Sequence, residues 1–107
     1  MADDNWVTVA KRSAINPGDV LGVTVGDREF ALYNLDGEIH ATDNLCTHAF
    51  ALLSQGWLDG EVIECPLHGG RFDIKTGKAM CPPVTEDLKT YKVRVVDDDV
   101  QIHVRQA

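Results

Sequence analysis

The amino-acid sequence predicts a small all-β protein, built as an antiparallel sandwich or barrel. Three observations lead to this prediction. The apolar runs have the length of strands, turn signals separate them at short intervals, and no window of eleven or more residues shows a clean helical period. The chain has 107 residues, enough for one domain and too few for two, so we expect a single domain spanning residues 1–107.

The expected strands share a high content of Val, Ile, Leu and aromatic residues. In chain order they are Trp6–Val9, Val20–Val25, Glu29–Leu35, Glu38–Thr42, Glu61–Glu64, Arg71–Ile74, Tyr91–Val96 and Val100–Val104. Gly, Pro, Asn and Asp favour turns, and such residues separate the strands at Asn16-Pro17-Gly18-Asp19, Gly26-Asp27, Asp36-Gly37, Asp59-Gly60, Thr76-Gly77 and Asp97-Asp98-Asp99.

The period of the pattern supports several of these strands. From Tyr91 to Val95 the apolar residues fall on one face and the two basic residues on the other, and Val100–Val104 alternates in the same way. The dipeptide Asp36-Gly37 between two apolar runs predicts a hairpin. The sequence leaves room for one short helix, at Ala49–Leu53.

Composition restricts the possible functions. A net charge of −7 argues against binding to nucleic acid; it allows either docking to a basic protein surface or simply solubility. No apolar run approaches the ~20 residues that span a bilayer, so no membrane segment is expected. The segment Met1–Asn5 lacks the features of a signal peptide, and the three cysteines are an odd number, so we expect a cytoplasmic protein with metal-bound or free thiols.

Two short segments carry the candidate chemistry. Cys46-Thr47-His48 and Cys65-Pro66-Leu67-His68 form a C-x-H and a C-x-x-H pair with sixteen residues between them. Each pair follows an expected strand, so two neighbouring loops can offer their side chains to one site. Two thiolates and two imidazoles suit zinc or an iron–sulfur cluster.

The order of the ligands separates these two possibilities. A structural zinc site usually pairs Cys with Cys and His with His along the chain. Here each loop supplies one of each, which fits a two-iron cluster with both cysteines on one iron and both histidines on the other. A structural zinc module stays the alternative, and it would be colourless and silent in electron paramagnetic resonance (EPR).

The ligand segments and several further stretches resemble a known family. Cys46-Thr47-His48 and Cys65–Gly70 resemble the cluster-binding loops of Rieske proteins. Other stretches resemble the ferredoxin components of bacterial aromatic-ring-hydroxylating dioxygenases of the naphthalene-dioxygenase type; these are Tyr33–Leu45, Gly69–Asp73, Lys75–Ala79 and Pro82-Pro83-Val84.

This resemblance implies a Rieske iron–sulfur fold, with two loops forming a cluster-binding subdomain around one Rieske-type [2Fe–2S] cluster. It implies Cys46, His48, Cys65 and His68 as metal ligands. The protein would be a soluble one-electron carrier, expected as a monomer and without catalytic activity of its own. It would take electrons from a flavin-containing NAD(P)H-dependent ferredoxin reductase and pass them to a terminal Rieske non-haem iron oxygenase that hydroxylates aromatic compounds.

The resemblance also predicts where the reduction potential lies. High-potential Rieske proteins carry a disulfide between the loops, at places that correspond to Ala51 and Leu67, and hydroxyl groups near sulfur at places that correspond to Gly70 and Phe72. Neither the disulfide nor these hydroxyls can exist in this chain. Because fewer donors to sulfur stabilise the reduced state less, we predict a potential at the low end of the Rieske range, roughly −150 mV.

Two other functions are weighed against the electron carrier. One is a small Rieske subunit of another reductase, such as nitrite reductase, in which cluster ligands are often lost, whereas this chain has all four. The other is a redox sensor, for which the sequence has no output element. A catalytic oxygenase would need a second, mononuclear iron site.

Several residues near the ligands have expected roles. Leu67 is expected in an apolar rim around the histidines, where it docks a partner or shields the cluster. Pro82-Pro83 resembles the loop that covers the cluster in this family, and Cys81 is expected to be a small buried residue beside it.

The remaining singled-out residues are expected to be structural. His40 and His103 are interpreted as surface or satisfied structural histidines, and Trp6 and Trp57 as residues of the core or its edge. Asp97-Asp98-Asp99 is expected to form a solvated hairpin tip.

Overall fold

The computed structural model describes residues 5–47, 51–67, 69–81 and 86–104, and this part of the chain contains strands and two 3₁₀ turns but no α-helix. In chain order the elements are β1 (Trp6–Lys11), η1 (Arg12–Ala14), β2 (Val20–Val25), β3 (Arg28–Leu35), β4 (Glu38–Asp43), η2 (Leu53–Gln55), β5 (Trp57–Asp59), β6 (Val62–Glu64), β7 (Arg71–Asp73), β8 (Ala79–Cys81), β9 (Thr90–Tyr91), β10 (Val93–Val96) and β11 (Asp99–His103). Within the described ranges, no helix is long and apolar enough to cross a membrane.

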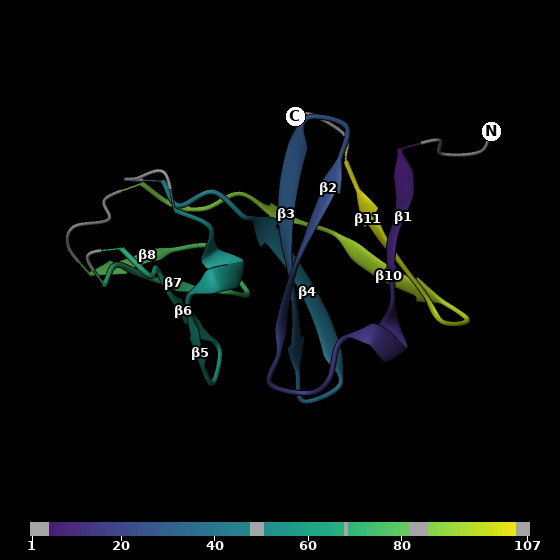
Figure 1. Cartoon of the computed structure of the whole chain (residues 1–107), viewed down its shortest axis with the longest axis horizontal. Coiled ribbons are helices and arrows are strands. Elements are labelled where there is room, and N and C mark those ends of the chain that lie inside the picture. Colours follow the sequence, from purple (N-terminus) through teal and green to yellow (C-terminus); the bar gives the residue numbers. More distant parts are fainter. Residues whose placement is uncertain (1–4, 48–50, 68, 82–85, 105–107) are drawn as a thin grey trace.

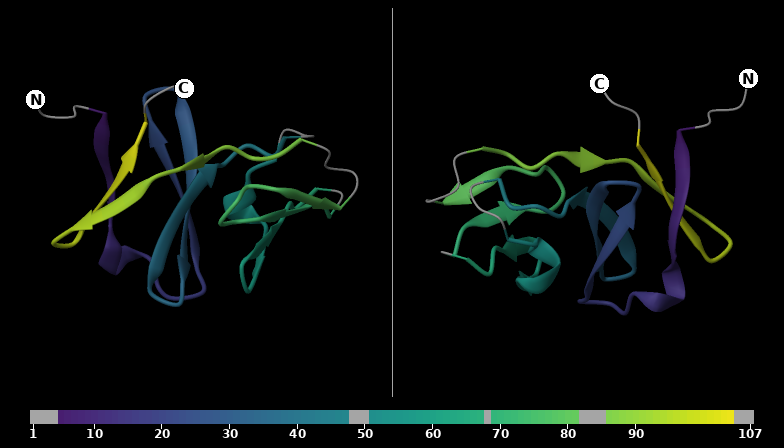
Figure 2. Two further views of the ribbon diagram at one scale, coloured as in Figure 1. Left: turned by 180° about the vertical axis from the view of Figure 1, so that it is seen from behind. Right: turned by 45° about the horizontal axis from the view of Figure 1, so that its top comes forward.

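The strands form three antiparallel sheets (Figures 1 and 2). The central sheet has the order β2-β3-β4-β9 and lies between the sheet β1-β11-β10 and the sheet β5-β6-β7-β8. We call the last of these sheets, with the loops beside it, the loop subdomain. Strands β1 and β11, the first and last strands of the chain, lie on the side away from the loop subdomain (Figure 1). The all-β antiparallel architecture predicted from the sequence is confirmed.

Strand β3 joins the two hydrophobic cores of the molecule. Successive side chains of a strand point to opposite faces, so Phe30 and Leu32 enter the core against β11, while Ala31 and Tyr33 enter the core against the loop subdomain. All four are fully buried. This explains why the middle of β3, residues 30–33, is an unbroken apolar run. Because one strand enters both cores, β3 also fixes the loop subdomain against the rest of the protein.

The end of β4 is fixed by a polar cluster around Tyr91. The Tyr91 hydroxyl donates to Asp43 Oδ1 at 2.5 Å and accepts from Arg28 at 3.0 Å. The Arg28 guanidinium also lies over the Phe30 ring, 5.0 Å from its centroid. This cluster holds β9 to the last residue of β4, three residues before the expected ligand Cys46.

The structure differs from the expected strand pattern in three places. Strands β5 and β8, of three residues each, were not predicted, and the register between β7 and β8 is irregular. The expected strand Tyr91–Val96 is interrupted at Lys92: Tyr91 pairs with β4 of the central sheet, while Val93 pairs with β11 of another sheet. One apolar run therefore contributes strands to two sheets. The alternation of its residues cannot indicate where it passes from one sheet to the other.

Two local predictions have mixed outcomes. Of the short helix allowed at Ala49–Leu53, residues 49 and 50 lie outside the described residues, and a 3₁₀ turn begins at Leu53 instead. The three aspartates do mark the β10–β11 hairpin tip. Two of their carboxylates also bind other residues of the protein: Asp98 accepts two hydrogen bonds from Ser13, and Asp99 pairs with Lys11 at 2.6 Å.

Gly77 provides a test of how the loop subdomain is attached. Its φ is +77°, and a Cβ there would lie 2.2 Å from the carbonyl oxygen of Leu88. Gly60 has a similar φ of +59° with nothing within 4 Å of an added Cβ. We expect Gly60→Ala to cost about 1 kcal/mol of unfolding free energy. Gly77→Ala should cost about 2 kcal/mol more, because the new methyl group also displaces the backbone at Leu88.

Chemical denaturation of the two variants measures this difference. Equal losses of stability would contradict the close approach between Gly77 and Leu88.

Candidate metal centre

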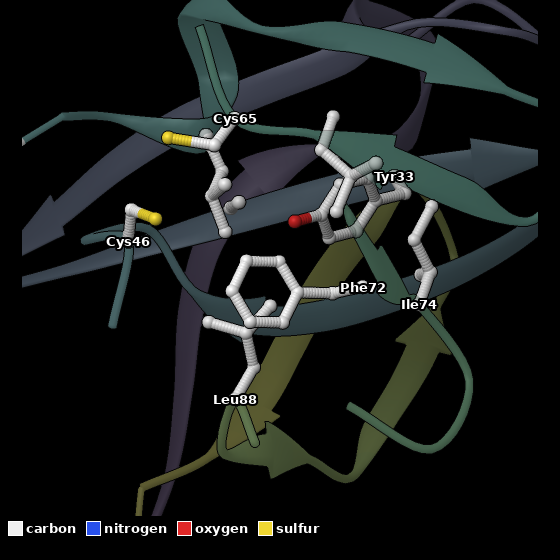
Figure 3. Close-up of a cluster of buried hydrophobic side chains, with 9 residues drawn as sticks. Tyr33, Cys46, Cys65, Phe72, Ile74 and Leu88 are labelled. Atoms are coloured by element: carbon white, nitrogen blue, oxygen red, sulfur yellow. The ribbon is translucent and has the colours of Figure 1, made fainter. Parts of the chain in front are cut away.

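The structure brings together the two cysteines of the predicted ligand set. Cys46 follows β4 and Cys65 follows β6 directly, and both are buried, with exposed fractions of 3% and 0%. Both belong to the core between the central sheet and the loop subdomain. Figure 3 shows them side by side at one end of this core, beyond Phe72 and Tyr33. The two cysteines are nineteen positions apart in the chain, so the fold brings together residues of two separate loops.

Backbone hydrogen bonds give each loop its shape. In the first loop, Cys46 N donates to Ala51 O at 2.9 Å, next to a β-bridge between Leu45 and Leu52. In the second loop, Cys65 N donates to Gly70 O at 2.7 Å. Each cysteine therefore stands at the entrance of a closed turn, which restricts where its sulfur can lie.

The second loop also directs a donor at sulfur. Leu67 N lies 3.5 Å from Cys65 Sγ, within the range of an N–H···S hydrogen bond. Such a bond stabilises a thiolate, and the turn that produces it passes through Gly69, whose φ is +73°. The turn therefore prepares Cys65 to be a metal ligand.

Burial acts against the Leu67 N–H, because it favours the protonated thiol of Cys65 in the metal-free protein. Removal from water raises the pKa of Cys65 from 9.0 to about 11, with a smaller contribution in the same direction from Cys46 and an opposing one from the Leu67 N–H. Cys65 is therefore protonated at neutral pH in the metal-free protein. Binding of a metal must displace this proton.

The donor set fits an iron–sulfur centre. All three cysteines lie within the described residues and none of them forms a disulfide there, and two of them are buried next to each other on separate loops. The other two predicted ligands, His48 and His68, lie outside the described residues, as do Pro82 and Pro83 of the predicted cover. Among the described residues no group of three or more metal-binding side chains occurs, so the described part of the site consists of the two thiols.

The positions linked to the potential are apolar. Phe72 is fully buried beside the cysteines, and Gly70 is also buried. Neither residue type has a hydroxyl group that could donate to sulfur. Ala51 and Leu67, the positions that the resemblance aligns with the disulfide of high-potential Rieske proteins, have no thiol. Leu67 is 42% exposed, consistent with its expected place in an apolar rim.

The other residues singled out in the sequence contact protein groups away from the two buried thiols. Cys81 is half-buried in β8, with Sγ 3.9 Å from Gly69 O, so it is less buried than predicted. His40 pairs with Glu38, and His103 packs edge-on against Trp6, as expected of structural histidines. Trp57 was interpreted as a residue of the core or its edge, and it is not in the core: its exposed fraction is 59%, and its neighbour Leu58 is the β5 residue that packs against the core.

Sequence reasoning missed Asn44 and Ser54, which join the two ends of the first loop. Both stand close to a ligand segment in the sequence. Asn and Ser are typical surface residues, however, so nothing in the sequence indicates that Asn44 is buried.

Comparison with known proteins identifies relatives over nearly the whole chain. The model of the Rieske [2Fe-2S] domain matches residues 5–92. The ferredoxin component of the naphthalene 1,2-dioxygenase system of Pseudomonas putida is 57% identical over 97 residues, covering 91% of this chain and 93% of the relative.

Solved structures agree with this similarity. One is a chain from the complex of reduced oxygenase and oxidised ferredoxin in carbazole 1,9a-dioxygenase; it is 37% identical and matches with a TM-score of 0.90, over 98% of both chains. A structure named as a nitrite reductase small subunit matches with a TM-score of 0.75 at 23% identity, over 91% of this chain and 96% of that one. At that identity it shows a shared fold only, so the reductase-subunit alternative is the more distant one.

The raised pKa of Cys65 predicts how the metal-free protein responds to alkali. The folded state holds the Cys65 proton more tightly than the unfolded state, so between pH 9 and about 11 folding stability should fall as pH rises. Thermal unfolding of the metal-free protein at pH 8.5, 9.5 and 10.5 measures this slope. In Cys65→Ser the slope should be smaller, since that group no longer titrates. A Cys65→Ser slope equal to the wild-type slope would contradict the assignment.

Proposed function

The chain belongs to the Rieske [2Fe–2S] domain family, and on this premise we propose that it is the ferredoxin component of a bacterial aromatic-ring dioxygenase system. It binds a Rieske-type [2Fe–2S] cluster and is an electron-transfer component rather than a catalytic subunit. The observation that carries the proposal is the 57% identity to a naphthalene dioxygenase ferredoxin over 91% of this chain. The single domain is proposed to span residues 1–107.

The proposed ligands are Cys46 and Cys65 for one iron and His48 and His68 for the other. Two buried thiols on neighbouring loops support the cysteine half of this set, and the C-x-H and C-x-x-H spacing supports the histidine half. When bound, the cluster supplies the chemistry of accepting and releasing one electron.

The residues around the cysteines prepare the protein for this task. The Leu67 N–H faces Cys65 Sγ and stabilises negative charge there, while Phe72 excludes water from the side of the core. Backbone hydrogen bonds from Cys46 N to Ala51 O and from Cys65 N to Gly70 O hold the two cysteines in place.

The partners follow from the same assignment. The electron acceptor is a terminal oxygenase that hydroxylates aromatic compounds, and the proposed donor is a flavin-containing NAD(P)H-dependent ferredoxin reductase. The charge of −7 favours partners with basic docking surfaces over nucleic acid. We propose a monomer that works in the cytoplasm, where thiols stay reduced.

Reconstitution tests the proposed function. The purified protein is combined with a dioxygenase reductase, NADH and a naphthalene-type terminal oxygenase, and hydroxylated product is measured. We expect product formation that depends on this protein. Absence of product with an active reductase and oxygenase, and with an intact cluster, would contradict the role of electron carrier.

The same assay tests the apolar rim. We expect Leu67→Ser to slow product formation about fivefold at limiting ferredoxin, because loss of an apolar contact at a docking centre costs roughly 1 kcal/mol. The backbone N–H at this position is kept. Val95→Ser is the matched control: Val95 is 40% exposed, close to the 42% of Leu67, but lies on β10. Equal effects of the two substitutions would contradict docking at Leu67.

Voltammetry tests the link between missing hydroxyls and potential. The wild-type protein is expected near the low end of the Rieske range, roughly −150 mV. The Phe72 ring points from β7 toward the cysteine end of the core (Figure 3), so Phe72→Tyr brings a hydroxyl to the sulfur side. A hydrogen bond of about 1 kcal/mol in the reduced state should raise the potential by about 40 mV. A clearly positive wild-type potential, or a lower potential in the variant, would contradict this explanation.

A further inference from the structure

Asn44 is a buried polar residue at the base of the first ligand loop, and its backbone and side chain both make hydrogen bonds. It is 2% exposed and lies two residues before Cys46. Its backbone N–H donates to Glu29 O at 3.1 Å and its carbonyl accepts from Leu53 N at 2.7 Å. These two bonds fix the position of Asn44 between β3 and η2.

The Asn44 side chain makes two more bonds, both to Ser54. Oδ1 accepts from Ser54 N at 2.8 Å, and Nδ2 donates to Ser54 Oγ at 3.0 Å. Because Asn44 precedes the loop and Ser54 follows it, this double contact closes the loop that carries Cys46. We call it the Asn44–Ser54 brace.

The central sheet has a space shaped for this brace. A Cβ at Gly22 in β2 would lie 2.7 Å from Ser54 Oγ and 2.9 Å from Asn44 Nδ2. Real side chains do not approach so closely, so any residue larger than glycine at position 22 would displace the brace. The brace therefore rests directly on the backbone of β2.

A second close contact connects the brace to the other ligand loop. Gly56 follows η2, and a Cβ there would lie 2.0 Å from the carbonyl oxygen of Glu64. Glu64 immediately precedes Cys65. A short, tightly packed path therefore runs from Cys46 through the brace and η2 to Cys65.

From this geometry we infer that Asn44 is a positioning residue, which sets the separation of the two ligand loops and thereby the retention and environment of the cluster. The inference rests on the proposed function, since it concerns the cluster. A [2Fe–2S] unit is rigid, so loops that keep a fixed separation bind it with less loss of conformational freedom than loops that move.

Two variants weaken the brace to different degrees. Asn44→Ala removes both side-chain bonds, and Ser54→Ala removes only the bond to Nδ2. Loss of a partner that orients metal ligands typically costs 10- to 100-fold in metal affinity, so we expect Asn44→Ala to lose its cluster about 10- to 100-fold faster than wild type in the presence of an iron chelator. For Ser54→Ala we expect about fivefold, the effect of one hydrogen bond.

Asn34→Ala is the matched control. Asn34 is 3% exposed and makes two side-chain hydrogen bonds of 2.7 Å, to Ile15 O and from Gly37 N, which do not involve either ligand loop. This variant should lose similar folding stability while keeping its cluster about as long as wild type.

The measurements are iron content, the decay of visible absorption in chelator, and the EPR spectrum and potential of the reduced protein. In Asn44→Ala we expect broadened EPR lines and a shifted potential, because the ligand loops take up several arrangements; Asn34→Ala should show neither. Equal decay and unchanged spectra in the two variants would overturn the inference. If Asn44→Ala does not fold, Ser54→Ala compared with Asn34→Ala decides in the same way. Wild-type protein without iron would instead overturn the proposed function, and the inference with it.

Discussion

Two thiols on two separate loops are held side by side in one apolar core, and the strands and turns around them keep them there. Cys46 and Cys65 each stand at the entrance of a turn closed by a backbone hydrogen bond, and each turn follows a strand anchored in a sheet. A thiol buried without a metal is inert and protonated, as the raised pKa of Cys65 indicates. Its burial is therefore useful to a protein that binds a metal, where an apolar environment restricts access of water and tunes the centre.

The three-layer fold explains how these thiols stay in place. Strand β3 contributes alternate side chains to two cores, so the loop subdomain packs on the same strand that organises the other sheets. The close approach of Gly77 to the Leu88 carbonyl and of Gly22 to the Asn44 and Ser54 side chains packs the subdomain tightly against the rest of the protein. The loop subdomain lies at the end of the molecule opposite to the sheet of β1, β10 and β11 (Figures 1 and 2).

Local patterns in the sequence predicted most of this fold, and tertiary contacts decided the rest. The alternation in Val100–Val104 and the Asp36-Gly37 turn are short-range signals, and both indicated the observed hairpins. The change of sheet at Lys92 and the exposure of Trp57 depend on which strands become neighbours, which no local period records. The two buried cysteines could be singled out from the sequence because metal binding demands particular residue types at close spacing. Asn44 was not, since its burial depends on the space beside Gly22.

The proposed function joins these features into a small electron carrier whose cluster has cysteines on one iron and histidines on the other. The most direct test of this central claim is electron–nuclear double resonance on the reduced protein with ¹⁵N-labelled histidine. The proposed ligand set predicts strong couplings from two histidine nitrogens, those of His48 and His68. A reduced cluster without strong histidine couplings would contradict it, because its irons would then have to be bound by cysteines or other ligands.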